Sequence, residues 1–365
     1  MPYPKYDFNK YLRSGVDKAH YLKALYAFIK PELKILDQLS KASAIDRIRA
    51  TLVQEKYECD YNDVSKALAN NTEADQELKH KVSAYNKCQK YISQRIETIN
   101  LNQLKKGHEI LLRGTNKEKY GGILRNLDQK QNIAANYEPP KNDQLNDLIG
   151  FLLEHIKKAS PNYPFIHALS VYLLFDIVQP FIVFNQAYSL IFFNAILKNL
   201  DADFNGLISF EKYMLNDWNT HNSIKLNSLF PINAKERIGE DLTAFFENCF
   251  TILGESLADV EDNLITSLKE SVNYKKMRPI ARNSFNYFFE MGFKKFHKKI
   301  TALNERQQAI LRDVIFNRNV TTKQMVMKYR CDRKTIQRDF ADLMELGIVA
   351  FEGKTKTVNY HLSFA

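Results

Sequence analysis

Residues 179–188 read QPFIVFNQAY and lie within the most apolar region of the chain, residues 165–197. A proline and an asparagine are unusual there, because proline lacks the backbone donor that a helix needs and asparagine carries a polar amide. Asp176 is the only acidic residue of this region, which holds no lysine or arginine. A membrane-spanning helix needs about 20 uninterrupted apolar residues. The polar interruptions instead predict two buried helices that meet at a turn.

The composition is that of a mainly helical globular protein. The 365 residues include 24 Phe and 19 Tyr but only 12 Gly and 10 Pro, and 45% of the chain is hydrophobic. Many aromatic residues and few helix breakers are typical of long packed helices. The spacing of apolar residues predicts helices over residues 17–99, 143–200 and 235–300. Paired glycines and paired prolines in residues 105–142 predict loops and a short hairpin.

Charge and cysteine content indicate the compartment and the kind of partner. The formal net charge of +10 favours a polyanion partner. The four cysteines are far apart in the sequence and form no CxxC pair, which argues against a disulfide framework and a zinc site: they are Cys59, Cys88, Cys249 and Cys331. The first residues lack the features of a signal peptide. We therefore expect a cytoplasmic protein that does not enter a membrane.

The C-terminal residues 301–365 have the pattern of a winged helix. Asn304 is placed to cap a helix over 305–316, and a short helix from Thr322 is followed by the turn YRCD. A third helix has one apolar face, and the segment IVAFEGKTKTVNYHL then alternates as a hairpin around Gly353. The apolar face consists of Ile336, Phe340, Leu343 and Met344.

Residues 321–349, TTKQMVMKYRCDRKTIQRDFADLMELGIV, resemble the helix-turn-helix of DeoR-type regulators. The resemblance implies that the third helix enters the DNA major groove. Its expected DNA contacts are Arg333, Lys334, Gln337 and Arg338, with Lys354 and Lys356 of the wing beside the backbone. Because winged helices also dock proteins, the fold alone does not decide the partner. Eleven basic against seven acidic residues in 301–365 favour nucleic acid.

The middle of the chain, residues 51–227, resembles the Fic family of AMP-transferring proteins. The segments GGILRN, ANYEPP, NDLIGFLLEHI and FDIVQPFIVFNQAYSL follow one another in the order of the family's flap, its "yvPP" segment, a core helix and the motif HPFxDGNGRxxR. The resemblance implies a helical core with a short flap hairpin that includes Gly122 and Arg125. It also places the motif on the turn between two buried helices.

The same resemblance implies that the motif has lost its chemistry. The family's histidine is a general base, its aspartate holds Mg²⁺ on the nucleotide, its GNG binds phosphate through backbone N–H groups, and its two arginines clamp phosphate. The corresponding residues here are Gln179, Val183, Phe184-Asn185-Gln186, Ala187 and Leu190, and only Pro180, Phe181 and Asn185 are kept. A glutamine accepts no proton near neutral pH and a valine offers no oxygen to a cation. No intact catalytic residue and no metal site are therefore expected.

Two further stretches resemble known motifs only in part. RATLVQEKYECDYNDV resembles the inhibitory [ST]xxxE[GN] motif of many Fic proteins through Thr51 and Glu55, but Leu190 replaces the arginine that the glutamate would meet. Glu55 is therefore expected to be a remnant or an ordinary polar contact. DADFNGLISFEKY resembles a calcium-binding loop, although Lys212 stands where the bidentate glutamate is required, which argues against calcium. The basic run KKFHKKI, residues 294–300, is interpreted as a solvated helix face.

The sequence thus predicts four regions: an N-terminal helical region with the inhibitory-like segment (1–104), a degenerate Fic core (105–235), a helical extension (236–300) and a winged helix (301–365). The hypothesis for function is a regulator that binds DNA without a cofactor, with the core retained as a scaffold for homodimerisation or for sensing a ligand. One alternative is a residual AMP- or nucleotidyl-transferase that would use ATP and Mg²⁺. Another is an adaptor that docks a protein at the flap.

Overall fold

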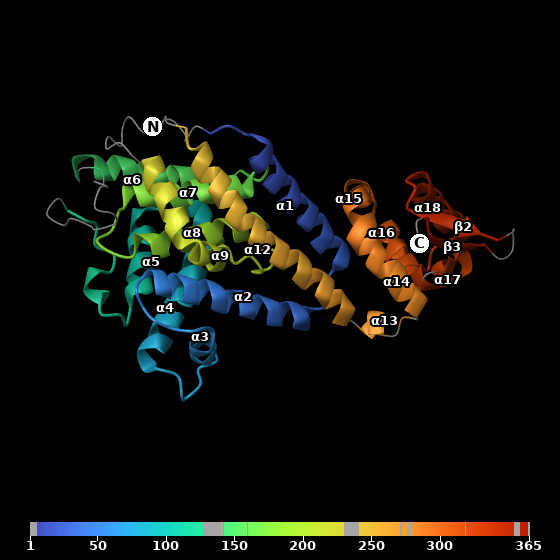
Figure 1. Cartoon of the computed structure of the whole chain (residues 1–365), viewed down its shortest axis with the longest axis horizontal. Helices are drawn as coiled ribbons and strands as arrows, with labels where there is room; N and C mark the ends of the chain where they lie inside the picture. Colours follow the sequence, from blue (N-terminus) through green and yellow to red (C-terminus); the bar gives the residue numbers. More distant parts are fainter. Residues whose placement is uncertain are drawn as a thin grey trace. The chain divides into compact units, whose positions relative to one another are not determined.

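The structure is a computed structural model that describes residues 6–126, 140, 142–158, 160–229, 241–270, 272–275, 277, 279–317, 319–353 and 358–363. Over these residues the protein is mainly helical with one small sheet, which confirms the predicted fold class (Figure 1). It packs as two compact units. The first comprises Met1–Ala19 and Asp37–Ala258, and the second comprises His20–Leu36 and Asp259–Ala365.

Helices up to residue 270 form most of the first unit, and their ends follow ordinary capping chemistry. In α3 and α5, the side chains of Asp60 and Asn100 accept from the backbone of Asp63 and Gln103, whose side chains accept in return. The α-helices are α1 (Lys10–Ile29), α2 (Leu33–Gln54), α3 (Tyr61–Leu68), α4 (Gln76–Ser93), α5 (Leu101–Leu112), α6 (Asn142–Lys157), α7 (Pro164–Val178), α8 (Asn185–Asn199), α9 (Phe210–Asn216), α10 (Trp218–Leu229) and α12 (Thr243–Glu270), with single turns at Ile96–Thr98 and Glu118–Tyr120.

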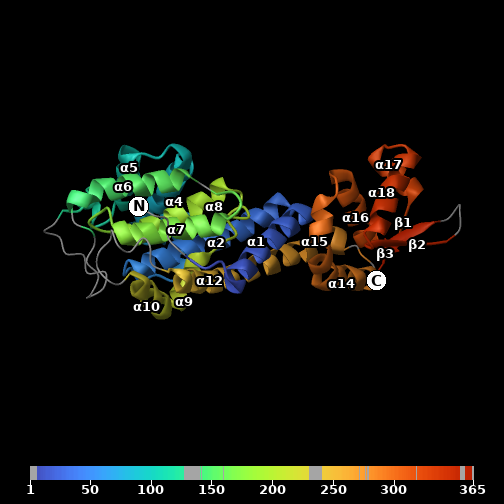
Figure 2. The ribbon, with the colours of Figure 1, turned by 90° about the horizontal axis from the view of Figure 1, so that it is seen from above.

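Helices α7 and α8 form the centre of the first unit. Every residue of α7 from Phe165 to Val178 is buried, and most of α8 is buried too. A helix that is apolar all round must be covered on all sides, and α8 packs against both α7 and α4 (Figures 1 and 2). The two buried helices that the sequence predicted are therefore confirmed. None of the helices in the described ranges combines the length and apolar character needed to cross a membrane.

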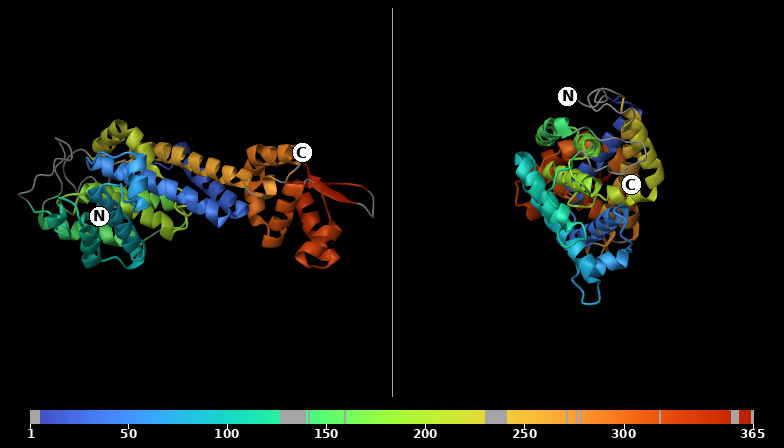
Figure 3. Two further views of the ribbon diagram at one scale, coloured as in Figure 1. Left: turned by 90° about the horizontal axis from the view of Figure 1, so that it is seen from below. Right: turned by 90° about the vertical axis from the view of Figure 1, so that its left-hand side faces the viewer.

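The second unit ends in a small helical module with a three-stranded antiparallel sheet of order β1-β3-β2. Strands β2 and β3 pair from Val349 opposite Leu362 to Glu352 opposite Asn359, and this hairpin projects beyond the helices (Figure 3). The elements of the unit are α13 (Val272–Lys275), α14 (Pro279–Tyr287), the π-helical turn η3 (Phe288–Gly292), α15 (Phe293–Ala302), α16 (Glu305–Asn317), β1 (Val320–Thr321), α17 (Thr322–Tyr329), α18 (Arg333–Glu345), β2 (Val349–Glu352) and β3 (Asn359–Leu362). The order α16, α17, α18, β2 and β3 agrees with the three helices and hairpin predicted for residues 301–365, whereas β1, the third strand of the sheet, was not predicted.

A buried ion pair fixes α10 to α7. The ammonium of Lys225 lies 2.8 Å from the carboxylate of Asp176, and both side chains are almost fully buried. The hydroxyl of Tyr172 lies 3.1 Å from Nε2 of His221, whose Nδ1 lies 2.7 Å from Oδ1 of Asn248 on α12. Removing one member of such a pair leaves a buried charge without compensation, which is more costly than removing both.

We therefore expect Lys225→Met to lower the free energy of unfolding of the first unit by about 3–5 kcal/mol. The double variant Lys225→Met/Asp176→Leu should recover most of that loss, because no buried charge remains. Urea unfolding followed by the fluorescence of Trp218, the only tryptophan, measures both. A double variant that is as unstable as the single variant would contradict this account of the pair.

Candidate functional site

The link between α7 and α8, residues 179–184, forms the candidate site of the first unit. Gln179 ends α7 with φ 43°, and Phe184 precedes α8 with φ 61°, so both residues adopt the left-handed region. This conformation costs an ordinary residue roughly 1–2 kcal/mol, whereas glycine adopts it freely. Phe184 occupies the position of the first glycine in the motif that the link resembles. Phe184 thus adopts a backbone conformation that glycine would adopt without strain.

The side chain of Asn185 closes the link. Its Oδ1 accepts from the backbone N–H of Phe181 at 2.9 Å, and its Nδ2 donates to the carbonyl of Phe181 at 2.8 Å. Phe181 itself is fully buried. Pro180, Phe181 and Asn185 therefore shape and anchor the link.

Arg125 ties the chain segment after α5 to the C-terminal end of α7. Its Nε donates to the carbonyl of Gln179 at 2.7 Å, and its Nη2 donates to the carbonyls of Pro140 and Val178. The last carbonyls of a helix lack partners within the helix and carry partial negative charge, so a buried guanidinium stabilises them. Leu124 forms an isolated antiparallel bridge with Phe181 beside this contact. The rest of the predicted flap hairpin, and all of ANYEPP except Pro140, lies outside the described residues.

His108 on α5 joins the same two segments, which sequence reasoning did not anticipate. Its Nδ1 accepts from the backbone N–H of Gly122 at 3.1 Å, and its Nε2–H donates to the carbonyl of Val183 at 2.9 Å. The ring stacks on Phe181 with centroids 3.8 Å apart. These bonds require the neutral tautomer with the proton on Nε2, and burial lowers the pKa of His108 to about 4. The only local signal was a single histidine in an apolar helix.

The positions that align with the functional residues of the motif that the link resembles are occupied by Gln179, Val183, Ala187 and Leu190. Gln179 is fully buried, and neither atom of its amide has a hydrogen-bond partner in the described part of the chain. Leu190 is fully buried and Ala187 nearly so, so the space of the two arginines is filled by apolar packing. The carbonyl of Val183 is already used by His108. The side chains of Gln179, Val183, Ala187 and Leu190 carry no group that accepts a proton near neutral pH, and the one oxygen among them is the amide oxygen of the fully buried Gln179.

Glu55 lies beside the N-terminal turn of α8. Burial raises the pKa of Glu55 to about 7, and a hydrogen bond from the backbone N–H of Ala187 acts in the opposite direction. The first backbone N–H groups of a helix attract anions. The carboxyl group of Glu55 thus lies at the N-terminal end of α8. Thr51, one turn earlier in α2, is buried and donates to the carbonyl of Arg47.

The calcium-like loop, residues 201–208, is held by an arginine. The guanidinium of Arg47 on α2 donates to the carbonyls of Gly206 and Ile208, at 2.7 and 2.5 Å. Asp203 Oδ1 accepts from the backbone N–H of Asn205. Within the described ranges no group of three or more His, Cys, Asp or Glu side chains is placed to hold a metal ion.

A second candidate site is the exposed face of α18. The expected DNA contacts Arg333, Lys334, Gln337 and Arg338 are all exposed and lie in the N-terminal half of this helix. On the opposite face Ile336, Phe340 and Leu343 are buried, while Met344 is partly buried. Phe340 stacks on Tyr360 of β3 with centroids 3.6 Å apart. The wing residues Lys354 and Lys356 lie outside the described residues.

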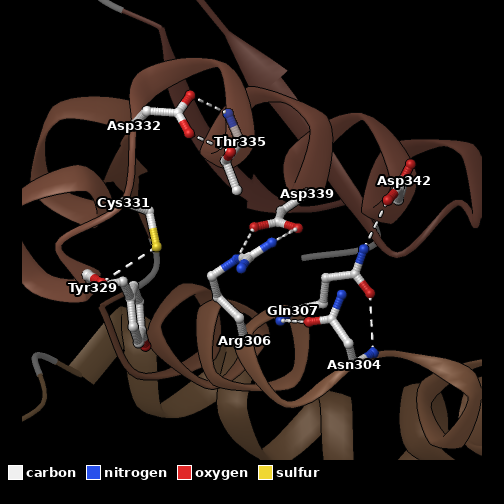
Figure 4. Close-up of polar contacts among 9 residues, drawn as sticks. All are labelled: Asn304, Arg306, Gln307, Tyr329, Cys331, Asp332, Thr335, Asp339 and Asp342. Atoms are coloured by element: carbon white, nitrogen blue, oxygen red, sulfur yellow. Dashed lines mark hydrogen bonds and ion pairs between the residues drawn. The ribbon is translucent and has the colours of Figure 1, made fainter.

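Polar contacts with α16 fix the orientation of α18 (Figure 4). Arg306 donates to both carboxylate oxygens of Asp339, from Nε at 2.6 Å and from Nη2 at 3.1 Å. Gln307 donates to Asp342 at 2.7 Å. Asp332 caps the helix by accepting from the backbone N–H of Thr335. Asp339 and Asp342 are therefore engaged by α16, and the exposed Glu345 lies at the C-terminal end of α18, whereas the cationic side chains lie in its N-terminal half.

Solved structures of Fic proteins resemble this chain. A Fic family protein from Desulfovibrio desulfuricans is 14% identical, with 98% of each chain covered and a TM-score of 0.57. A Fic domain containing signaling protein from Bacteroides thetaiotaomicron is 11% identical, with 69% of this chain and 99% of that chain covered and a TM-score of 0.55. Fic-1 from C. elegans is 10% identical over 70% of this chain and 71% of that one, with a TM-score of 0.52.

No family model and no curated protein matches the sequence. At these identities the structural likeness shows the fold, and it supports a Fic-type fold for this chain.

The hydrogen bonds of neutral His108 to Gly122 and Val183, which we call the His108 clamp, predict that the protein becomes less stable in acid. An unfolded histidine binds a proton near pH 6.5, but folded His108 does so only near pH 4, so the unfolded state binds more protons between these values. Stability is complete above about pH 6.5 and falls as the pH is lowered toward 4. In the variant His108→Asn, the free energy of unfolding should change less with pH, by up to about 1.4 kcal/mol per pH unit. Urea unfolding at several pH values measures it.

The exposed His80 provides the control, since His80→Asn should leave the slope as in the wild type. Some pH dependence of the free energy of unfolding remains in every variant, because burial also lowers the pKa values of His155 and His221 to about 4. An unchanged slope in His108→Asn would contradict the neutral clamp.

Glu55 predicts a pH dependence of opposite sign. Its folded pKa of about 7 lies above the unfolded value, so the folded state binds more protons between about pH 4.5 and 7, and stability is lost as the pH rises through this window. Glu55→Gln keeps an oxygen for the Ala187 N–H and carries no charge. We expect this variant to be more stable than the wild type at pH 8 by on the order of 1 kcal/mol, and equal to it near pH 5. The exposed Glu58→Gln is the control, and a wild-type-like Glu55→Gln at pH 8 would exclude a buried, protonated Glu55.

Proposed function

We propose that this protein is a DNA-binding regulator whose Fic-type core no longer transfers a nucleotidyl group. The observation that carries the proposal is the exposed row of Arg333, Lys334, Gln337 and Arg338 on a helix whose inner face is fully engaged. Arginine and lysine in the first turns of a helix suit both phosphate oxygens and guanine edges.

The surroundings of α18 support the same function. The order α16, α17, α18 and the β2–β3 hairpin is that of a winged helix, and the sequence of α17 and α18 resembles DeoR-type regulators. In such modules the last helix lies in the major groove and the wing contacts the backbone. The acidic Asp339 and Asp342 face α16 and so do not repel DNA. A winged helix that only docks a protein would not need this concentration of exposed cations.

The core supports a role other than catalysis. Gln179, Val183, Ala187 and Leu190 stand in place of base, metal ligand and phosphate clamps, and transfer of a phosphoryl group depends on positioning and charge stabilisation by such groups. A similar structure is described as a Fic domain containing signaling protein. We assign the core the part of a scaffold for homodimerisation or ligand sensing in a signalling protein.

Binding of the intact chain to labelled duplex DNA tests the proposal. We expect fluorescence anisotropy with genomic fragments to show binding at 50 mM salt that weakens steeply as salt is raised, because bound phosphates release counterions. The double variant Arg333→Ala/Lys334→Ala should bind at least tenfold more weakly, since each lost contact of this kind costs about 1–3 kcal/mol.

The double variant Lys87→Ala/Lys90→Ala removes two exposed charges from α4 of the first unit and is the matched control. It should bind as the wild type does. No wild-type binding at 50 mM salt, or equal losses in the two double variants, would argue instead for a protein-docking module or a nonspecific effect of net charge.

A further inference from the structure

Helix α15 carries a face of four exposed lysines, which we call the α15 lysine face: Lys294, Lys295, Lys298 and Lys299. The positions i, i+1, i+4 and i+5 fall on one side of a helix within two turns. Their side chains lie over roughly 7.5 Å of helix axis, from a rise of about 1.5 Å per residue. The sequence alone was compatible with a merely solvated face.

The opposite side of α15 explains why the helix forms without help from the lysines. Phe293, Phe296 and Ile300 are buried, and Phe293 packs on Phe28 with ring centroids 5.3 Å apart. The π-helical turn η3 inserts an extra residue in the turn before α15, which keeps Phe288, Phe289 and Phe293 on the buried side. Folding of this helix is therefore driven by its aromatic face.

The lysine face costs stability. Lysines at i and i+4 repel each other by roughly 0.2–0.5 kcal/mol per pair, and the face contains two such pairs, 294 with 298 and 295 with 299. Repulsion of this kind is relieved by a partner that carries several negative charges. The nearest exposed acid on the same helix is Glu290, one turn before Lys294.

Contacts within the protein account for two of the four lysines. The ammonium of Lys294 lies 3.8 Å from the carboxylate of Glu261. Lys299 donates to the carbonyl of Leu346 at 3.4 Å. It also lies in the last turn of α15, where the helix dipole favours a cation. Within the described residues, the contact of Lys295 is with the ring of its neighbour Phe296, with the ammonium 5.2 Å from the centroid. For Lys298, the described part of the chain offers no acidic partner within ion-pair distance. No ion pair within the described residues thus accounts for the charges of Lys295 and Lys298.

The contact of Lys299 with Leu346 also places the face within the second unit. Leu346 caps the C-terminal end of α18, so the α15 lysine face lies beside that end of the helix. The exposed cations of α18 lie toward its other end, and α18 is about 20 Å long by its rise per residue. A recognition helix lies in the major groove, which is about 12 Å wide, so the phosphates that border the groove come close to the ends of a helix about 20 Å long.

We propose that Lys295 and Lys298 bind phosphates of the DNA backbone that flanks the site contacted by α18. This inference rests on the proposed DNA-binding function and adds a second, sequence-independent contact to it. A lysine ammonium is a point charge that suits phosphate without reading the base. The two lysines therefore contribute to affinity and to its salt dependence, and leave the sequence preference to α18.

The test is a salt series of DNA binding by the intact chain, with the double variant Lys295→Ala/Lys298→Ala. Each phosphate contact contributes about 0.9 to the slope of log K against log salt, so the slope should fall by about 1.8 in magnitude. Affinity at 100 mM salt should fall on the order of tenfold or more, by the same amount for different DNA sequences. Alanine favours a helix, so α15 is retained, which circular dichroism checks.

The control Lys87→Ala/Lys90→Ala removes two exposed lysines with the same i, i+3 spacing from α4, and its slope should equal that of the wild type. If the wild type binds DNA but both double variants keep its slope, the inference fails and the proposed function stands. If the wild type binds no DNA, both fail. Binding to phosphatidylserine vesicles that is lost in Lys295→Ala/Lys298→Ala, with DNA binding unchanged, would assign the face to a membrane and overturn the inference.

Discussion

The two hydrogen bonds between the amide of Asn185 and the backbone of Phe181 are the constraint on which the first unit depends. They close the link between two helices that are buried on nearly all sides, where an open loop would leave backbone groups without partners. Arg125 and His108 then attach neighbouring segments to the closed link through its carbonyls. All these contacts use backbone atoms of the link, apart from the Asn185 amide. Closure of the link therefore uses none of the side chains of Gln179, Val183, Ala187 and Leu190.

Cations inside the two units are engaged by acidic or carbonyl groups, whereas Arg333, Lys334 and Arg338 on α18 and Lys295 and Lys298 on α15 are exposed. Arg47 and Arg125 donate to carbonyls, Lys225 is paired with Asp176, and Arg306 is paired with Asp339. A buried charge must be paired because desolvation is costly. An exposed charge carries no such requirement, so the cations on the outer faces of α18 and α15 remain available to a polyanion. The same physical rule thus separates the residues that hold the structure together from those that are free to bind.

The sequence predicted those parts of the structure that local pattern determines. Uninterrupted apolar residues predicted buried α7 and α8, the polar interruption predicted the link, and Asn304 with the apolar face around Ile336 and Phe340 predicted α16 and α18. The clamp by His108 could not be predicted, because it joins residues 75 positions apart through backbone atoms that have no sequence signature. For the same reason the roles of Arg47 and Arg125 were missed. Glu55 was expected to be a remnant or an ordinary polar contact, and the hydrogen bond with the backbone of Ala187 at the N-terminal turn of α8 fits the second alternative.

The central claim is that the Fic-type core keeps its fold without its chemistry. Incubation of the intact chain with radiolabelled ATP and Mg²⁺, with and without a cell extract as a source of targets, tests it most directly. The account predicts no protein labelling above that of a heat-denatured control, and none after the single change Gln179→His, because the metal ligand and phosphate clamps would still be missing. Robust labelling of the chain or of a target, or its recovery in Gln179→His alone, would contradict the account.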